Sequence, residues 1–202
     1  MLCTPLIATI VLAAGGSSRL GRPKQLVRYR GVPLVVHAAT AALAATLGPV
    51  LVVVGAAADA VSALLVPLSV DTIINPRWSD GMGTSLAAGV AAVPAAVDAA
   101  IVMVCDQPTV TKEHLTALAA CFARRTSTSI VATTYTGAGG GEVVGVPALF
   151  ARTHFAELMQ LPADRGAKAV LQRHQARLES IALPGGEIDV DTPADLARLA
   201  QI

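Results

Sequence analysis

The segment 6–16 constrains the fold more than any other part of the chain. It is apolar up to Ala14, apart from Thr9, and then ends in two glycines. A short apolar run that stops at glycine indicates a strand buried on both faces, as in a parallel sheet. Similar runs at 50–54 and 99–104 alternate with stretches of helical periodicity. This alternation predicts a doubly wound α/β sheet.

The loop that follows, residues 15–24, reads Gly-Gly-Ser-Ser-Arg-Leu-Gly-Arg-Pro-Lys. In an open α/β sheet, ligands bind beyond the carboxyl ends of the strands. Glycines let backbone N–H groups approach an anion closely, and Arg19 and Lys24 add positive charge. We therefore expect this loop to bind a polyphosphate. An ordinary Gly/Ser turn is the alternative, and the two basic residues favour the phosphate.

Two other phosphate-binding loops are excluded by the residues around this glycine cluster. Gly16 and Gly21 have the spacing of a Walker loop, but Arg22-Pro23 stands where Lys-Ser/Thr is required. The proline also prevents a helix from starting there. The dinucleotide fingerprint G-x-G-x-x-G is not matched either.

Composition limits the classes of function that this chain can have. The chain has 202 residues, a net charge of +1 and only 3% aromatic residues. We expect a single domain over 1–202, with no broad electrostatic field for nucleic acid or a membrane. No apolar run free of glycine, proline and charge approaches the ~20 residues of a membrane span. The three cysteines are widely spaced and indicate a reduced, cytoplasmic protein.

The histidines give no indication of a metal site in the sequence. They stand at positions 37, 114, 154 and 174, without the spacing of metal ligands. We therefore expect them to be solvated or part of the core.

One carboxylate stands where a metal ion is expected. Asp106 follows the predicted strand 99–104, in the sequence Cys-Asp-Gln-Pro. A carboxylate beside a phosphate loop can hold Mg²⁺, which takes one or two carboxylates together with substrate phosphates. A simple turn residue is the alternative for an isolated Asp-x-Pro.

The rest of the chain alternates between strands and helices. A polar loop at 75–85 leads into a helix in which Thr84 or Ser85 acts as the cap, leaving N–H groups that face the crevice. The glycine run 137–141 is either a lid or a tolerated insertion. Helices are predicted over 33–47, 58–66, 84–93, 111–124, 154–161 and 166–174, with a last one starting at 192–193, and strands over 70–74 and 129–134.

The glycine loop also carries a family resemblance. L-A-A-G-G-S-S-R-L-G-R-P-K at 12–24 resembles the signature loop of nucleotidyltransferases, and most closely that of the molybdenum cofactor cytidylyltransferases. Further resemblances lie at 75–85, 105–108, 145–150, 163–168 and 189–195, so that nearly the whole chain is covered. Val146 departs from the polar residue usual in the family. The resemblance implies a Rossmann-like, three-layer α/β/α fold with a mostly parallel sheet.

The resemblance also implies roles for individual residues. Arg19 and Lys24 would stabilise the α-phosphate and the leaving pyrophosphate, and Asp106 would anchor Mg²⁺. We expect only one carboxylate of the ending 188–195 to face the crevice, with Asp189 as a second metal ligand and Asp191 structural. The predicted nucleotide-binding residues are Leu12, Ala13, Ala14, Gly15, Gly16, Ser17, Ser18, Gly21, Asn75, Gly83 and Ser85. The predicted acceptor-binding residues are Gly145, Pro147, Asp164 and Lys168, with a helix cap as the competing role for Asp164.

The implied reaction moves CMP from CTP to the terminal phosphate of molybdopterin or its molybdenum form and releases pyrophosphate. A molybdenum hydroxylase or its chaperone would be the protein partner. Ala13-Ala14-Gly15 and Pro-Lys-Gln-Leu at 23–26 favour CTP, because the guanylyl branch tends to read L-A-G-G. A guanylyltransferase that uses GTP and a non-catalytic cofactor carrier are the alternatives.

Overall fold

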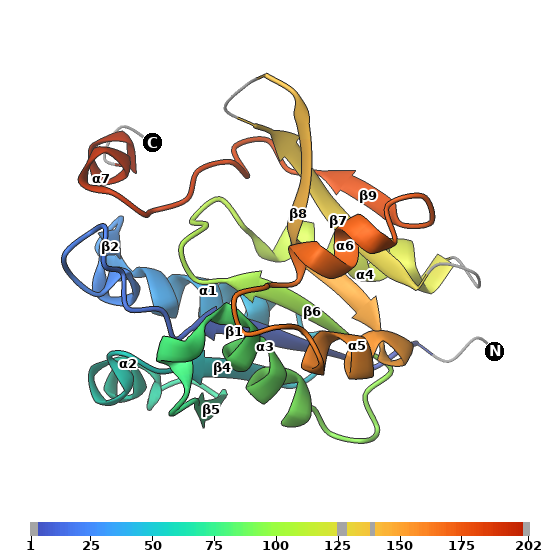
Figure 1. The fold of residues 1–202 in the computed structure, drawn as a ribbon, viewed down its shortest axis with the longest axis horizontal. Helices are drawn as coiled ribbons and strands as arrows, with labels where there is room; N and C mark the ends of the chain where they lie inside the picture. The colour runs from blue at the N-terminus through green and yellow to red at the C-terminus, as the bar shows by residue number, and fades with distance from the viewer. Residues whose placement is uncertain (1–3, 125–128, 138–139, 200–202) are drawn as a thin grey trace.

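The computed structural model describes residues 4–124, 129–137 and 140–199 (Figure 1). Within them, seven strands form one sheet in the order β5-β4-β1-β6-β8-β7-β9. β8 runs antiparallel to both of its neighbours, and all other pairs are parallel. The strands are β1 (Ile7–Ala13), β4 (Val50–Val54), β5 (Asp71–Ile74), β6 (Ala99–Val104), β7 (Ile130–Thr136), β8 (Glu142–Ala151) and β9 (Glu179–Ala182).

Helices cover both faces of the sheet, which confirms the predicted three-layer fold. One face carries α1 (Leu34–Ala44), α2 (Ala58–Leu65) and α4 (Lys112–Arg124). The other face carries α3 (Met82–Ala91), α5 (Phe155–Met159) and α6 (Lys168–Arg173), as Figure 1 shows. α7 (Pro193–Leu199) follows the last loop.

Strand β1 contributes to both cores because alternate side chains of a strand point to opposite faces. Val11 and Ala13 pack under α1, whereas Ile10 and Leu12 pack under α3. Small residues let the helices approach closely. A Cβ atom at Gly89 of α3 would lie 2.6 Å from Ile10 Cγ2, so only glycine allows α3 to sit so near the sheet.

The strand order places a switch point beside β1. From β1 the chain moves through β4 to β5, and α3 then carries it back to β6 on the other side of β1. The loops after β1 and β6 therefore start next to each other, at the edge of the sheet where the parallel strands end. Such a point is where open α/β sheets bind their ligands.

The order of elements follows the prediction up to β6, with some differences in detail. The predicted connection 25–31 overlaps η1 (Lys24–Leu26) and the start of a small hairpin of β2 (Arg28–Tyr29) and β3 (Val32–Pro33). Helix α3 begins at Met82, two residues before the predicted start, because Gly81 takes up the N-cap with φ 133°. Thr84 and Ser85 therefore do not cap it.

The second half of the chain differs more. β8 and β9 were not predicted, and helices α5 and α6 are shorter than expected. The glycine run 137–141 connects β7 to β8, with Gly137 N–H donating to Gly141 O at 2.8 Å, while residues 138–139 lie outside the described part. In the part that is described, no helix is both long and apolar enough to cross a membrane.

His114 of α4 is buried and holds one tautomer. The hydroxyl of Thr133 in β7 donates to Pro147 O, so it can only accept from His114 Nε2, 2.8 Å away. The imidazole therefore carries its proton on Nε2. Burial lowers the pKa of His114 below its usual value.

We predict that His114 makes the protein less stable in mild acid. Below the unfolded pKa of about 6.5, the unfolded chain binds a proton that the native state resists, so the free energy of unfolding decreases as the pH is lowered. His114→Gln, whose amide can still donate to Thr133, should show a smaller loss of unfolding free energy between about pH 7.5 and about pH 5.5. Urea unfolding at both pH values measures this, and an unchanged loss in the variant would contradict it.

Candidate functional site

The glycine loop after β1 is held in shape from within. Ser17 adopts φ 51°, its carbonyl accepts from the N–H groups of Leu20 and Gly21 at 3.1 Å, and its hydroxyl accepts from Lys24 N–H at 3.0 Å. The buried amide of Gln25 donates to both Ala13 O and Gly15 O at 2.8 Å. The loop conformation is therefore fixed without using its outer N–H groups.

These outer N–H groups remain available to a ligand. Among the described residues, none accepts a hydrogen bond from the backbone N–H of Gly15, Gly16, Ser18 or Arg19. Consecutive free N–H groups at the end of a buried strand form the concave surface that binds phosphate oxygens.

Trp78 closes the loop on one side. A Cβ atom at Gly16 would lie 2.9 Å from Trp78 Cζ3, and one at Gly55 would lie 2.6 Å from Trp78 Cβ. Both glycines are therefore required for the indole to pack between the loop after β1 and the loop after β4.

Two cations of the loop meet carboxylates from distant parts of the chain. Lys24 Nζ contacts Asp106 and also lies 2.8 Å from Asp191 Oδ1. Arg19 lies 2.7 Å from the other oxygen of Asp191. Burial opposes the charge on Lys24, but Asp106 and Asp191 outweigh it and raise the pKa of the ammonium group. Burial likewise opposes ionisation of Asp191, and Lys24 and Arg19 lower its pKa.

Two adjoining cavities open at this cluster. The narrow cavity, about 260 Å³, lies against the glycine loop, and its lining includes Ala14, Gly15, Trp78 and Ser85. The wide cavity, about 430 Å³, lies toward β8 and the loop before α6. Leu12, Lys24, Met82, Val104 and Asp106 line both cavities, so the charged pair stands at their boundary.

The expectation that only one carboxylate of the ending 188–195 faces the crevice is wrong. Asp189 and Asp191 both line the wide cavity, and Val190 between them is fully buried. Side chains two residues apart in an extended segment share a side, so the pair faces the cavity together. The structural role expected for Asp191 is likewise incomplete, because it binds both loop cations.

The donor set suits a divalent cation. One oxygen of Asp106 faces Lys24, while Oδ1 is buried and has no partner in the described structure. Asp189 lies nearby, and burial together with Asp106 raises its pKa to about 6. An unpaired carboxylate oxygen beside a second carboxylate matches the oxygen ligands that Mg²⁺ takes.

The structure brings most predicted site residues to these cavities, but not all. Those that line a cavity are Leu12, Ala14, Gly15, Arg19, Lys24, Ser85, Asp106, Gly145, Asp164, Lys168 and Asp189. Gly16, Ser17, Ser18 and Gly21 belong to the loop without lining either cavity. The remaining four predicted residues make contacts elsewhere in the structure, namely Ala13, Asn75, Gly83 and Pro147.

Three of these four have a clear structural role. Ala13 packs in the core under α1. Asn75 is buried, and its amide donates to the hydroxyls of Thr84 and Ser85 at 2.9 Å, which fixes the start of α3. Gly83 donates to Ala163 O at 2.8 Å, and a Cβ atom there would lie 2.3 Å from Pro162 O. It therefore joins α3 to the loop that carries Asp164.

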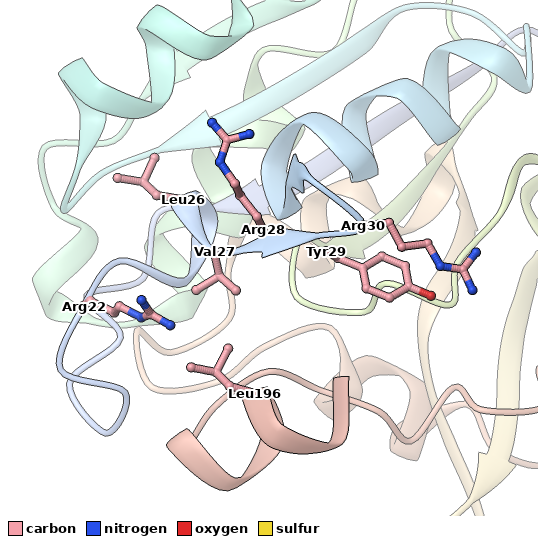
Figure 2. Close-up of a pocket in the computed structure, with 7 residues that line it drawn as sticks. All are labelled: Arg22, Leu26, Val27, Arg28, Tyr29, Arg30 and Leu196. Atoms are coloured by element: carbon pink, nitrogen blue, oxygen red, sulfur yellow. The ribbon is translucent and has the colours of Figure 1, made fainter. Parts of the chain in front are cut away.

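A third cavity, about 450 Å³, lies between residues 22–30 and α7 (Figure 2). Val27 and Leu196 point toward each other across it, and both belong to one small apolar cluster. Within the described part of the chain, none of the predicted site residues lines this cavity, and no carboxylate side chain does. We therefore assign the chemistry to the pair of cavities at Lys24 and Asp106.

Comparison with known proteins identifies the family. The sequence model described as the MobA-like NTP transferase domain matches residues 9–178. The chain belongs to this family.

Relatives and solved structures agree with this assignment. PucB, a purine catabolism protein of Bacillus subtilis, is 28% identical over 98% of both chains. A nicotine blue oxidoreductase of Paenarthrobacter nicotinovorans is 41% identical over 52% of this chain. The match covers only 51% of that relative's own length. The crystal structure of Rv0371c from Mycobacterium tuberculosis has a TM-score of 0.83 at 30% identity, covering 99% of this chain and 100% of its own. Another structure of Rv0371c is a manganese complex, with a TM-score of 0.79 at 29% identity over 96% of this chain and 98% of its own.

Several residues at the site of this MobA-like chain were missed in the sequence. Tyr135 lines the wide cavity. A Cβ atom at Gly145 would lie 2.5 Å from the Tyr135 hydroxyl, so only glycine leaves room for it. Met82 lines both cavities, and Gln107 lines the wide one. Tyr135 was missed because the predicted strand ended at Thr134, whereas Gln107 stands within the recognised Asp-Gln-Pro motif.

We predict that two glycines of the site respond differently to alanine. Gly83→Ala should destabilise the protein by ~1–3 kcal/mol, because the new methyl group collides with the backbone at Pro162. Gly15→Ala meets no atom within 4 Å and should leave stability nearly unchanged, which makes it the matched control. Denaturant unfolding of both variants tests this, and equal stabilities would refute the packing role of Gly83.

Proposed function

We propose that this MobA-like nucleotidyltransferase moves CMP from CTP to the terminal phosphate of molybdopterin or its molybdenum form. An acceptor oxygen attacks the α-phosphorus, the bond from the α-phosphorus to the bridging oxygen breaks, and pyrophosphate leaves. The modified cofactor would then pass to a molybdenum hydroxylase or its chaperone. The single observation that carries this proposal is the row of free N–H groups beside Lys24 and Asp106, where the two cavities meet.

The two cavities give each substrate its own side. The narrow cavity, next to the glycine loop, suits the nucleotide, and the wide one, next to Asp164 and Lys168, suits the acceptor. Their shared boundary is where the acceptor oxygen and the α-phosphorus would meet. Transfer of this kind depends on placing the two groups in line and on neutralising charge, so no nucleophilic side chain is required.

Charge at the boundary supports the same reaction. Arg19 and Lys24 would leave Asp191 in part to stabilise the oxygens of the α-phosphate and the leaving pyrophosphate. Asp106, through its unpaired Oδ1, and Asp189 would hold Mg²⁺. A bound divalent ion would neutralise the phosphate oxygens.

The preference for CTP rests on Ala14. Its methyl group is buried and lines the narrow cavity, which leaves less room for a base than glycine would. The guanylyl branch tends to have glycine at this position, so the methyl group favours the smaller pyrimidine. Transfer of GMP from GTP and a carrier role without turnover are the competing functions.

We predict that the loop cations are needed for turnover. Arg19→Gln removes the charge of an exposed side chain that the fold does not need. This variant should lower the rate of pyrophosphate release at least about 10-fold, because removing a buried donor to a transition-state oxygen lowers kcat by a factor of about 10²–10³. Lys24→Ala should lower the rate at least about 100-fold. Lys112→Ala, which changes an exposed lysine outside the site, serves as the control.

The assay combines nucleotide, molybdopterin and Mg²⁺ and follows pyrophosphate. Thermal unfolding of Lys24→Ala must accompany it, because this variant leaves Asp106 unpaired. Turnover of both variants within a few-fold of the wild type would overturn the catalytic assignment. Nucleotide binding without any pyrophosphate release by the wild type would instead indicate the carrier.

We also predict that α-labelled CTP labels the product better than α-labelled GTP. Ala14→Gly should narrow this difference, because it removes the methyl group from the narrow cavity. Competition between the two nucleotides at equal concentration gives the ratio directly. Better labelling by GTP in the wild type would establish the guanylyltransferase instead.

A further inference from the structure

Two histidines and a glutamate gather around α5 and α6, and all three are half-buried. His154 ends the short turn before α5, Glu157 lies in α5, and His174 follows α6. Glu157 Oε2 lies 2.9 Å from His174 Nε2 and 3.4 Å from His154 Nδ1. Among the described residues, this is the one group of three or more His, Cys, Asp or Glu side chains placed to hold a metal ion, and its ligand atoms all lie within 4.8 Å of one another.

Two of the three separations between these ligand atoms are close to those around a tetrahedral ion. With bonds of about 2.0–2.1 Å, two ligands of a tetrahedral Zn²⁺ lie about 3.3 Å apart. Glu157 Oε2 lies 2.9 and 3.4 Å from the two imidazole nitrogens, on either side of this value, and all three ligand atoms lie within 4.8 Å of one another. Two imidazoles and one carboxylate are also the ligand types that Zn²⁺ accepts, with a fourth position left for water.

Outer contacts orient two of the ligands. Ser129 Oγ lies 2.9 Å from His154 Nε2, so that nitrogen can keep the proton while Nδ1 presents its lone pair. Arg173 donates to Glu157 Oε1 at 3.0 Å and leaves Oε2 for the ion. Such outer partners, here on two of the three ligands, are characteristic of metal sites. The cationic Arg173 is mostly exposed, and its charge opposes that of an ion.

We propose that His154, Glu157 and His174 bind one zinc-type divalent cation, separate from the site at Asp106. The ion would join α5 to α6, and the connection between these helices carries Asp164, Gly166 and Ala167 of the wide cavity. It would therefore fix one wall of that cavity from behind. The competing explanation is a hydrogen-bond network in which both imidazoles donate to Glu157.

Titration of Zn²⁺ into chelator-treated protein without an affinity tag distinguishes the metal site from the hydrogen-bond network. We expect one Zn²⁺ bound with micromolar or tighter affinity and a higher melting temperature in its presence. His174→Ala should weaken binding at least about 100-fold, since loss of even an outer partner costs ~10–100-fold. His114→Gln, a histidine outside the cluster, and Asp106→Asn should both retain the site.

Two further measurements keep the proposal testable if His174→Ala does not fold. Arg173→Gln keeps a group that can donate to Glu157 Oε1 but removes the charge that opposes the ion, so this variant should bind Zn²⁺ more tightly than the wild type. Co²⁺ bound to the wild type should show the strong visible absorption of a four-coordinate ion. Absence of binding at 100 μM Zn²⁺, loss of the site in Asp106→Asn alone, or a weak six-coordinate Co²⁺ spectrum would each overturn the proposal.

Discussion

The contact of Lys24 with Asp106 and Asp191 is the interaction on which the site depends. It joins three parts of the chain, namely the loop after β1, the end of β6 and the segment before α7. Removing charges from water costs several kcal/mol per ion, so such a cluster contributes little net stability. Its effect is positional, because it holds an ammonium group and two carboxylates at the boundary of the two cavities.

The sequence predicted this half of the fold well, for local reasons. A short apolar run such as β1 that stops at glycines favours a buried strand, and the glycines after it favour a loop. Because parallel strands end at one edge, Asp106 after β6 was expected near the loop, and the structure brings it to Lys24. The strand order that makes this edge a switch point could not be read in the same way, since it depends on which strands pair.

The contacts that the sequence did not predict join distant residues. β8 was missed because an antiparallel strand entering a parallel sheet has no local signature. Gly83 and Asn75 lie in a motif of the nucleotide side, yet both are occupied in joining α3 to its neighbours. His154 and His174 meet only because α6 turns the chain back toward α5. Spacing along the sequence cannot show such a meeting.

Asp191, the last carboxylate of the site along the chain, is synthesised long after Lys24, with which it pairs. Lys24 and Asp191 are separated by 167 residues, although their side chains touch. At ~5–20 residues per second, the ribosome takes roughly 8–33 s to cover that distance. During this interval the nascent chain carries a basic loop whose final counter-charge has not yet been made. The pocket is therefore among the last features of the molecule to be completed.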